Sequence, residues 1–489
     1  MAAYWRVFLA CAVLLRLTLA LPTCDNVLSI LPGKVFVPDT QFYNDSISSY
    51  FYLSGQQSPS YIVAPATADE VAIVFKAIND CSIDHVAVRS GGHATNPGFS
   101  NADQGVTVDL RGLNDIHLSK EDPDLVSIGA GALSVDVYDV LDPLNRTVLG
   151  ARVASVGVGG FLTGGGISFF SAQHGFGCDS IRNMQVVLAN GTIVEANATS
   201  HPRLFRALKG GQNNFGVVTR FDLVAYPQPA FWGGAVMYPS EADAAQLSAF
   251  AQLKMSAEYD PHVALEQTFV YLGAQKTYSS TNNMFYTKPV ANASALRPFT
   301  DIQPQTSNTM RISGASDFAT ELEGFQLKAQ FAVYATLSLP VSATMLVRVH
   351  EMWRESNPDL VAKVLDITST MTYQSIPPPP VADASQNSLG FASNATPQKD
   401  MVLLLFSYYW GNDKDSTVVN TAVSELTKSV QEAFGDKDSY KYLNYAASWQ
   451  DPIASYGKES VRELIQVSKL YDPTGVFQKV VSGGFKLGV

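Results

Sequence analysis

The chain has 489 residues, of which 46% are hydrophobic and 16% charged, so it can bury a large core and is expected to form two or three domains. Its net charge of −11 argues against nucleic acid as a partner, because phosphate binding needs clustered Lys and Arg and no basic run occurs. No CxxC pair is present either, which removes the commonest redox and metal motif of that type.

The N-terminus reads MAAYWRVFLACAVLLRLTLALPTC, in which Arg6 precedes an apolar run that ends in small residues. This pattern is typical of a secretory signal peptide over residues 1–20, with cleavage near Ala20 or Leu21. The alternative is a short membrane anchor, but the run is short and Arg16 interrupts it. We therefore expect a protein that is secreted or held in a secretory-pathway vesicle.

The glycosylation sequons and the cysteines are consistent with passage through the secretory pathway. Sites for glycosylation are predicted at Asn44, Asn145, Asn190, Asn197, Asn292 and Asn394. Three cysteines remain after the signal peptide, and in an oxidising compartment a Cys24–Cys81 disulfide is the simple hypothesis. The third, Cys178, is then expected to be a buried apolar residue.

The segment over residues 60–93 predicts a strand, a helix and a second strand. Thr67 and Glu70 form a capping-box pattern at the helix start, and apolar residues at 71, 74, 75 and 78 share one helical face. A further strand and helix follow over residues 125–145, with Ser134 as a plausible N-cap. Asn190-Gly191 predicts a hairpin with a type I′ turn. Together these elements predict a compact mixed unit from about Ile62 to Tyr226.

Beyond Pro227 the predicted strands and helices become longer. Residues 262–272, 325–338 and 400–410 read as strands, and residues 342–356 and 416–434 as amphipathic helices. The pattern predicts a sheet covered by helices on one side. The tail predicts a helix that stops at Pro473, and the Pro- and Ser-rich stretch 375–388 reads as a surface loop.

Three glycine-rich segments lie within the first unit, over residues 89–93, 154–170 and 209–219. Glycine lets successive backbone N–H groups point into one concavity, so three such loops favour a phosphate-bearing cofactor. The Rossmann pattern fails, since Leu162 and Ser134 stand where the third glycine is needed. P-loop, H-E-x-x-H and G-x-S-x-G motifs are absent and the histidines lack metal-ligand spacing, so no metal is expected.

The motifs VAVRSGGHA, VGVGGFLTGGGISFF, LKGGQNNFGVVT and YLNYA…KLYDPTGVF, in this order, resemble the berberine bridge enzyme-like FAD-linked oxidoreductases of the vanillyl-alcohol oxidase superfamily, in a fungal-type secreted form. The resemblance implies an α+β fold. A bipartite p-cresol methylhydroxylase-type (PCMH-type) FAD-binding domain is expected at 40–226, and a substrate domain of an antiparallel sheet covered by helices at 227–435. Residues 436–489 are expected to return to the FAD domain.

By this resemblance, His93 carries FAD covalently on the flavin 8α methyl, which requires a neutral imidazole nitrogen. The alternative is a hydrogen-bonded turn histidine. The amides of residues 90–93 would hold the pyrophosphate. Cofactor contacts are expected at Arg89, Ser90, Gly91, Gly92, His93, Ala94, Val156, Gly157, Gly159, Gly160, Gly164, Gly165, Gly216, Val218 and Asn444.

Three positions depart from or refine the family pattern. Many members have a second link from a cysteine where this chain has Val153, so we expect attachment through His93 only. Ala94 replaces the family's serine. A valine at the place of Val156 goes with oxygen reactivity in related proteins, which favours an oxidase over a dehydrogenase.

The family passes a hydride from a small organic substrate to flavin N5, and O2 then accepts the electrons as H2O2. Tyr442 of the Y-x-N motif is the expected catalytic residue, as a phenolate base or a hydrogen-bond partner, the alternative being a core aromatic. Several members have a catalytic carboxylate where this chain offers Tyr373 and Gln374, so the base could be a tyrosine pair, lie elsewhere or not be needed. Residues 408–410, Tyr-Tyr-Trp, could line a pocket or fill the core.

Other functions stay open from the sequence. The chain could be a dehydrogenase or cyclase that makes a secondary metabolite, or a degenerate flavin-binding protein. A secreted glycan-binding protein without a cofactor is a further alternative. The expected form is a monomer that acts on an alcohol, a sugar or a secondary-metabolite precursor.

Overall fold

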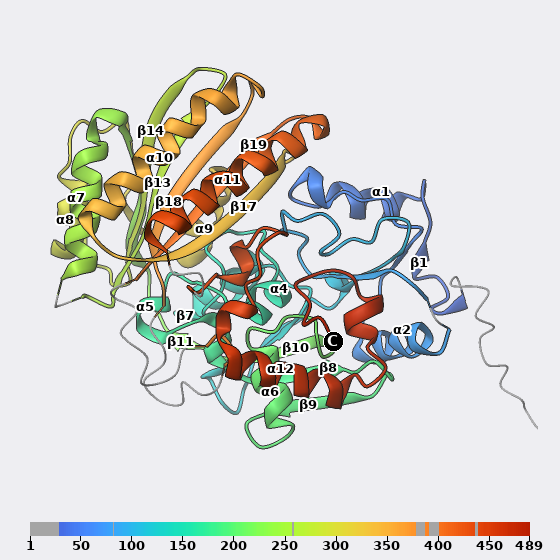
Figure 1. The fold of residues 1–489 in the computed structure, drawn as a ribbon. Helices are drawn as coiled ribbons and strands as arrows, with labels where there is room; N and C mark the ends of the chain where they lie inside the picture. The colour runs from blue at the N-terminus through green and yellow to red at the C-terminus, as the bar shows by residue number, and fades with distance from the viewer. Residues whose placement is uncertain (1–28, 82, 257–258, 378–386, 391–400, 436–438) are drawn as a thin grey trace, which may run out of the picture.

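The computed structural model describes residues 29–489 except 82, 257–258, 378–386, 391–400 and 436–438 (Figure 1). The predicted signal peptide, Cys24 and Asn394 lie outside the described residues, as does the side chain of Cys81. The secretion and disulfide hypotheses therefore stay predictions. No helix in the described ranges is long and apolar enough to cross a bilayer.

The first unit holds two small sheets of different character. One is mainly parallel, in the order β1(Val35–Phe36), β2(Tyr61–Val63), β4(Val106–Asp109), β3(Val86–Arg89). The other is antiparallel, in the order β5(Ile116–Leu118), β6(Leu125–Gly129), β10(Val217–Val224), β8(Ile181–Val187), β9(Ile193–Asn197). A short pair, β7(Arg146–Thr147) and β11(Tyr226–Pro227), closes the unit. Its helices are α1(Gln41–Ser48), α2(Ala68–Cys81), α3(Ser134–Leu141), α4(Val158–Thr163), α5(Ser171–His174) and α6(Pro202–Leu208).

The start of α2 follows the predicted capping pattern in one half only. The Thr67 hydroxyl accepts a hydrogen bond from the Glu70 amide at 3.2 Å, as a capping box requires. The Glu70 carboxylate accepts from the Ala66 amide at 2.7 Å, one residue earlier than the motif has it, and also binds Lys34 Nζ. The predicted strand, helix and strand are confirmed.

The predicted N-cap role of Ser134 is wrong. Ser134 is the first residue of α3, preceded by Leu133 in extended backbone. Its hydroxyl donates to the Val156 carbonyl at 3.0 Å and accepts from the Ala151 amide at 3.2 Å. The side chain therefore ties the second glycine segment to the helix instead of capping it.

The hairpin β8–β9 forms as predicted, but its turn is not type I′. Register pairs Val187 with Ile193, so the loop is longer than the two residues of that turn. Only Gly191 has a left-handed backbone, with φ +80, whereas type I′ needs two such residues. Asn190 instead accepts a bond from the Thr192 amide through its side chain.

The second unit is built on one 8-stranded antiparallel sheet, as predicted. Its order is β15(Ser307–Asn308), β12(Phe231–Pro239), β14(Thr277–Tyr286), β13(Val263–Leu272), β18(Thr368–Ser375), β19(Met401–Trp410), β17(Phe331–Pro340), with β16(Arg311–Ser313) also on β12. The helices are α7(Asp243–Met255), α8(Arg297–Thr300), α9(Ala315–Gly324), α10(Ala343–Val361) and α11(Ser416–Phe434). Figure 1 shows α7, α10 and α11 together over one face of the sheet.

The two faces of this sheet have different surroundings. Along β13 every second side chain is buried, including Leu265, Phe269 and Tyr271, and these pack in the core beneath the helices. The alternate side chains, Glu266 and Thr268 among them, are only partly buried and line a cavity on the opposite face. The helices α7, α10 and α11 cover one face, whereas α9 packs near β12 on the other face, where β13, β18 and β19 are left to form one wall of a binding site.

The C-terminal segment returns to the first unit, as Figure 1 shows for α12(Lys458–Tyr471), which lies beside α6. Leu464, Val467 and Phe477 are fully buried in the core of the first unit, although more than 200 residues separate them from it in sequence. Phe477 stacks on Phe75 of α2 at 5.3 Å between ring centroids. The first unit is thus completed by the end of the chain.

The five sequons within the described residues differ in accessibility. Asn44, Asn145, Asn190 and Asn292 are exposed, as glycosylation needs. Asn197 is only partly exposed, and its side-chain amide donates to Asn183 while its oxygen accepts from two backbone amides. A glycan on Asn197 would have to replace these bonds.

We predict that Phe477→Ala lowers the free energy of unfolding by about 3–5 kcal/mol, because it removes a buried aromatic ring and leaves a cavity against Phe75. The measurement is the urea midpoint of the transition that releases the first unit. Leu470→Ala, at a site that is 59% exposed, is the matched control and should change stability by less than about 0.5 kcal/mol. Equal effects of the two variants would contradict the described return of the chain.

Candidate active site

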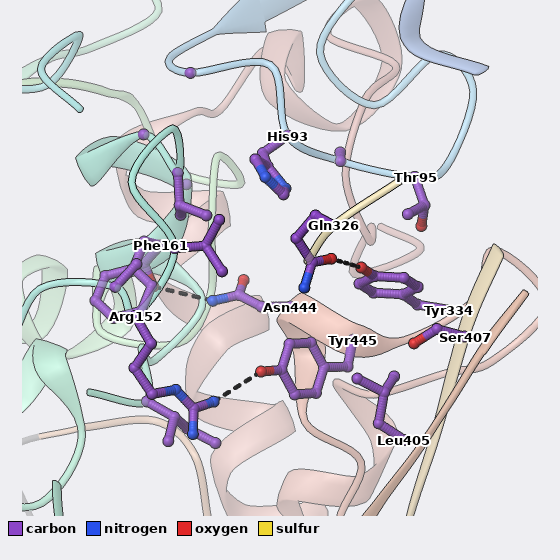
Figure 2. A pocket seen from close by; sticks show the side chains of 18 of the residues that line it. His93, Thr95, Arg152, Phe161, Gln326, Tyr334, Leu405, Ser407, Asn444 and Tyr445 are labelled. Atoms are coloured by element: carbon purple, nitrogen blue, oxygen red, sulfur yellow. Dashed lines mark hydrogen bonds between the residues drawn. The ribbon is translucent and has the colours of Figure 1, made fainter. Parts of the chain in front are cut away.

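One cavity of about 580 Å³ lies between the two units. The glycine segments of the first unit and the C-terminal residues 442–446 line one side, and the open face of the large sheet lines the other. Figure 2 shows His93, Asn444, Arg152, Tyr445, Gln326 and Tyr334 around this space. Within the described residues, no cluster of side chains could hold a metal ion.

The loop at residues 90–94 brings a row of backbone N–H groups to the wall of this cavity. All five residues line it, and none of their N–H groups donates a hydrogen bond within the described part of the chain. Gly92 has φ +79, so a left-handed residue sits inside the row. Successive N–H groups arranged in this way form a concavity that binds anions.

Two glycine loops cross with their backbones in close contact at Gly91 of that row. A Cβ on Gly91 would lie 2.5 Å from the Gly157 nitrogen, and one on Gly157 would lie 2.2 Å from the Gly91 nitrogen. Ser90 fastens the crossing, because its hydroxyl donates to the Ala130 carbonyl at 2.7 Å and accepts from the Gly159 amide at 3.1 Å. These glycines therefore serve the close approach of two loops as well as contact with a ligand.

Arg89 does not reach the cavity, which corrects its expected role as a contact. Its guanidinium is fully buried and donates to the Ser46 carbonyl at 2.6 Å, lies 3.7 Å from Asp109 Oδ2 and stacks over Tyr50. Asp109 is shared with Arg111, which binds it at 2.8 Å. The residue anchors the loop from behind.

His93 is held as a neutral ring at the edge of the cavity. Burial lowers the pKa of its imidazole to about 4. The ring stacks on Phe51 at 4.2 Å between centroids and meets the edge of Tyr52 at 5.5 Å. Its Nε2 is buried and has no hydrogen-bond partner among the described residues. Nε2 therefore makes no bond of the kind that a hydrogen-bonded turn histidine would use to hold its ring.

The other expected contact positions divide into two groups. Ala94, Val156, Gly157, Gly159, Gly160, Gly216, Val218 and Asn444 line the cavity, as does Val153. Gly164 and Gly165 do not, which corrects their expected role. A Cβ on Gly164 would lie 2.0 Å from Asn444 Oδ1, so this glycine makes room for that side chain. Cys178 is confirmed as a buried apolar residue, and burial raises the pKa of its thiol.

Tyr442 lines the cavity, and its expected role as a catalytic base or hydrogen-bond partner stays a prediction. Its hydroxyl accepts from the Gly166 amide at 3.1 Å and from Asn444 Nδ2 at 3.1 Å, and the residue is 1% exposed. Burial raises the pKa of this phenol far above its usual range. Asn444 also donates to the Phe161 carbonyl at 3.0 Å (Figure 2).

A polar cluster that the sequence did not single out lies one turn further on, at Tyr445. Arg152 Nη2 donates to the Tyr445 hydroxyl at 2.9 Å and to Gln374 Oε1 at 2.9 Å, and pairs with Glu266 Oε1 at 3.0 Å. Figure 2 shows the bond from Arg152 to the Tyr445 hydroxyl. The four side chains come from both units and from the C-terminal segment, and all line the cavity or touch a residue that does.

The strand next to β18 carries a carboxylate beside the position where the family resemblance led us to expect one. In the β13–β18 register Glu266 stands directly opposite Gln374. Glu266 is the one charged residue of β13, on the face that alternation leaves away from the helices. That pattern in the sequence could have identified it, since a lone acid within an apolar strand indicates a site or a partner.

Residues 408–410 point to both sides of the sheet. Tyr409 lines the cavity, whereas Tyr408 and Trp410 are buried in the core beneath the helices. Tyr373 also points to the helix side, where its hydroxyl donates to the Leu346 carbonyl at 2.8 Å. The strand period of two therefore places only one of the three candidate aromatics in the site.

Comparison with known proteins agrees with this arrangement. Residues 59–197 match the family described as FAD binding domain. An FAD-dependent monooxygenase of Aspergillus calidoustus is 33% identical over 471 residues, covering 94% of this chain and 88% of the relative.

Two solved structures share the fold. A 6-hydroxy-D-nicotine oxidase from Arthrobacter nicotinovorans matches with a TM-score of 0.77 at 20% identity, covering 92% of this chain and 98% of that one. Glucooligosaccharide oxidase from Acremonium strictum, described with a 6-S-cysteinyl, 8α-N1-histidyl FAD, matches with a TM-score of 0.74 at 16% identity, covering 93% and 97%. Taken with the motifs and the site, these similarities show that the chain belongs to the berberine bridge enzyme-like family of FAD-binding oxidoreductases.

Proposed function

We propose that the protein is an FAD-dependent oxidase that removes a hydride from a small organic alcohol and passes the electrons to O2, giving H2O2. One observation carries this proposal. A single cavity has an anion-binding row of N–H groups and a neutral, unpartnered imidazole at one part of its wall, and a phenol held by a cation at another.

The residues fit FAD. The row of N–H groups at 90–94 would hold the pyrophosphate, and His93 would carry the flavin through its second ring nitrogen, because Nε2 is enclosed. When bound, the flavin accepts a hydride at N5 and returns electrons to oxygen. Valine at position 153 leaves no thiol for a second bond, so attachment would be through His93 alone.

We predict that flavin absorbance and fluorescence stay with the acid-precipitated wild-type protein and with its denatured gel band. In His93→Ala all of the flavin should be released on denaturation, because neither a cysteine nor a second histidine is among the described residues that line the cavity. His117→Ala, at an exposed site, is the matched control and should keep the flavin. Flavin retained by His93→Ala would contradict the attachment.

Tyr445 is the proposed base for the substrate O–H. Its hydroxyl lies within hydrogen-bond reach of Arg152, and a guanidinium at 2.9 Å stabilises the phenolate over the phenol. Burial opposes this effect and is the larger influence, so the pKa of Tyr445 stays above its ordinary value, and Glu266 raises it as well. Gln374 and Glu266 fix Arg152 in place through its other bonds.

This charge arrangement predicts an increase in substrate-dependent flavin reduction with pH into the alkaline range, because the deprotonated form of a group with a raised pKa becomes more populated as pH rises. Glu266→Gln should shift the midpoint of this increase, the alkaline limb of the pH profile, about one pH unit lower, and Arg152→Met should shift it about one pH unit higher. The measurement is anaerobic stopped-flow bleaching, using the alcohol that releases most peroxide from a panel of benzylic alcohols and oligosaccharides.

Tyr442→Phe is the matched control for this series, since it removes a phenol from the same short segment that has no bond to Arg152. It should leave the position of the limb unchanged, whereas Tyr445→Phe should abolish the limb. If the limb disappears with Tyr442→Phe and survives Tyr445→Phe, the assignment of the base is reversed.

A monooxygenase is the second candidate, because the relative from Aspergillus calidoustus has that name. An oxidase gives one H2O2 per substrate oxidised and puts no oxygen from 18O2 into the product, whereas a monooxygenase inserts one such atom. Val156 lines the cavity beside the glycine crossing, and Val156→Leu should slow oxidation of the reduced flavin by obstructing O2. Oxygen insertion would decide for the second candidate, and unchanged oxygen reactivity in Val156→Leu would remove that residue's role.

A further inference from the structure

Three tyrosines meet at the cavity wall. The Tyr334 hydroxyl lies 2.7 Å from that of Tyr52 and 3.0 Å from that of Tyr409. Tyr52 and Tyr409 come from different units and are buried, and both Tyr334 and Tyr409 line the cavity. Burial raises the pKa of all three phenols, so each carries its proton. We call these residues the tyrosine cluster.

The tyrosine cluster is hydrogen-bonded to the side-chain amide of Gln326. Tyr334 donates to Gln326 Oε1 at 3.1 Å. With Tyr52 and Tyr409 donating to the Tyr334 oxygen, this bond gives each of the three phenol protons an acceptor. The carbonyl end of Gln326 is thereby turned to the cluster, and the orientation of its amide follows from the hydrogen bonds around it.

The nitrogen end of Gln326 faces open space. Nε2 donates no hydrogen bond within the described part of the chain, and the residue lines the cavity. Figure 2 shows Nε2 directed toward Asn444 and Tyr445, with Oε1 toward Tyr334. The Tyr334 ring also stands edge-on to Tyr445 at 6.2 Å between centroids. Gln326 and Tyr445 therefore face the same part of the cavity.

We propose that Gln326 Nε2 binds a carbonyl oxygen of the substrate, and that the tyrosine cluster positions it to do so. This inference rests on the proposed function. A carbonyl needs only donors, which Gln326 offers, whereas a hydroxyl at that place would also need an acceptor for its proton. The substrate class is thus a ring that bears a ketone or lactone carbonyl beside the alcohol that Tyr445 deprotonates. In this arrangement Gln326 is a binding residue, and Tyr334 is a positioning residue.

The surrounding wall combines apolar and hydroxyl side chains. Phe161, Leu322 and Leu405 line the same cavity, as do Thr370 and Ser407 of the sheet. Gln326 is partly buried, so a ligand that covers its amide without accepting a hydrogen bond loses free energy. Gln326 would accordingly discriminate between rings of equal size that differ in one oxygen.

The test compares equilibrium binding of 1-tetralone and of tetralin, which differ only in the carbonyl, by titration of flavin fluorescence in the holoenzyme. We expect the ketone to bind about tenfold more tightly to the wild type, the effect of one hydrogen bond in an enclosed site. Gln326→Leu and Gln326→Glu, which both remove the amide donor, should bring the two affinities within about twofold. Tyr334→Phe should do the same by releasing the amide.

Tyr373→Phe is the matched control, since it removes a phenol from the other face of the same sheet, and it should keep the preference. A wild type without a ketone preference, including one that binds neither compound at its solubility limit, overturns the proposal. So does a preference that survives both Gln326 variants. Binding needs no turnover, so failure of the proposed oxidase would appear separately as absence of peroxide while the preference remained.

Discussion

The crossing of Gly91 over Gly157 is the constraint on which the site depends. Two backbones can approach this closely only if neither residue carries a Cβ. The crossing brings the loop after β3 against the segment before α4, and Ser90 and Ser134 fasten the pair to neighbouring backbone. With the loop held in this way, its residues line the cavity and their N–H groups have no hydrogen-bond partner among the described residues.

The large sheet supplies the other half of the site because its two faces differ. Apolar residues of β13 and β19 pack under α10 and α11, and the residues between them in sequence face the first unit. Helix α9 of the second unit lies apart from α7, α10 and α11 and contacts the second glycine segment. There the Ala319 carbonyl accepts from the Ala154 amide, and Glu323 accepts from the Ser155 amide. The same helix leads directly to Gln326. The cavity wall and the loops that would hold the flavin are thus fixed by a shared element.

The sequence was most informative where the pattern is local. The strand and helix around Thr67, the helix at residues 416–434 and the glycine loop before His93 follow from short-range periodicity and turn chemistry. The predicted N-cap role of Ser134 was wrong because a hydroxyl can satisfy a local motif or a distant partner, and spacing does not distinguish them. Arg152 and Tyr445 become meaningful only after segments separated by more than a hundred residues are brought together, which no window of sequence contains. Gln326 bonds to Tyr334 eight residues away, but Tyr334 in turn meets Tyr52, which lies 282 residues earlier in the chain.

The pairing of Glu266 with Gln374 across two strands carries a consequence for how such enzymes are compared. Opposite positions in an antiparallel ladder have side chains close enough to exchange roles, so a negative charge can move from one strand to the next and remain in the same place in space. A comparison made column by column would classify this chain as having lost its acid. A comparison made over cross-strand pairs would find the charge preserved, and would group the chain with members that a positional criterion sets apart.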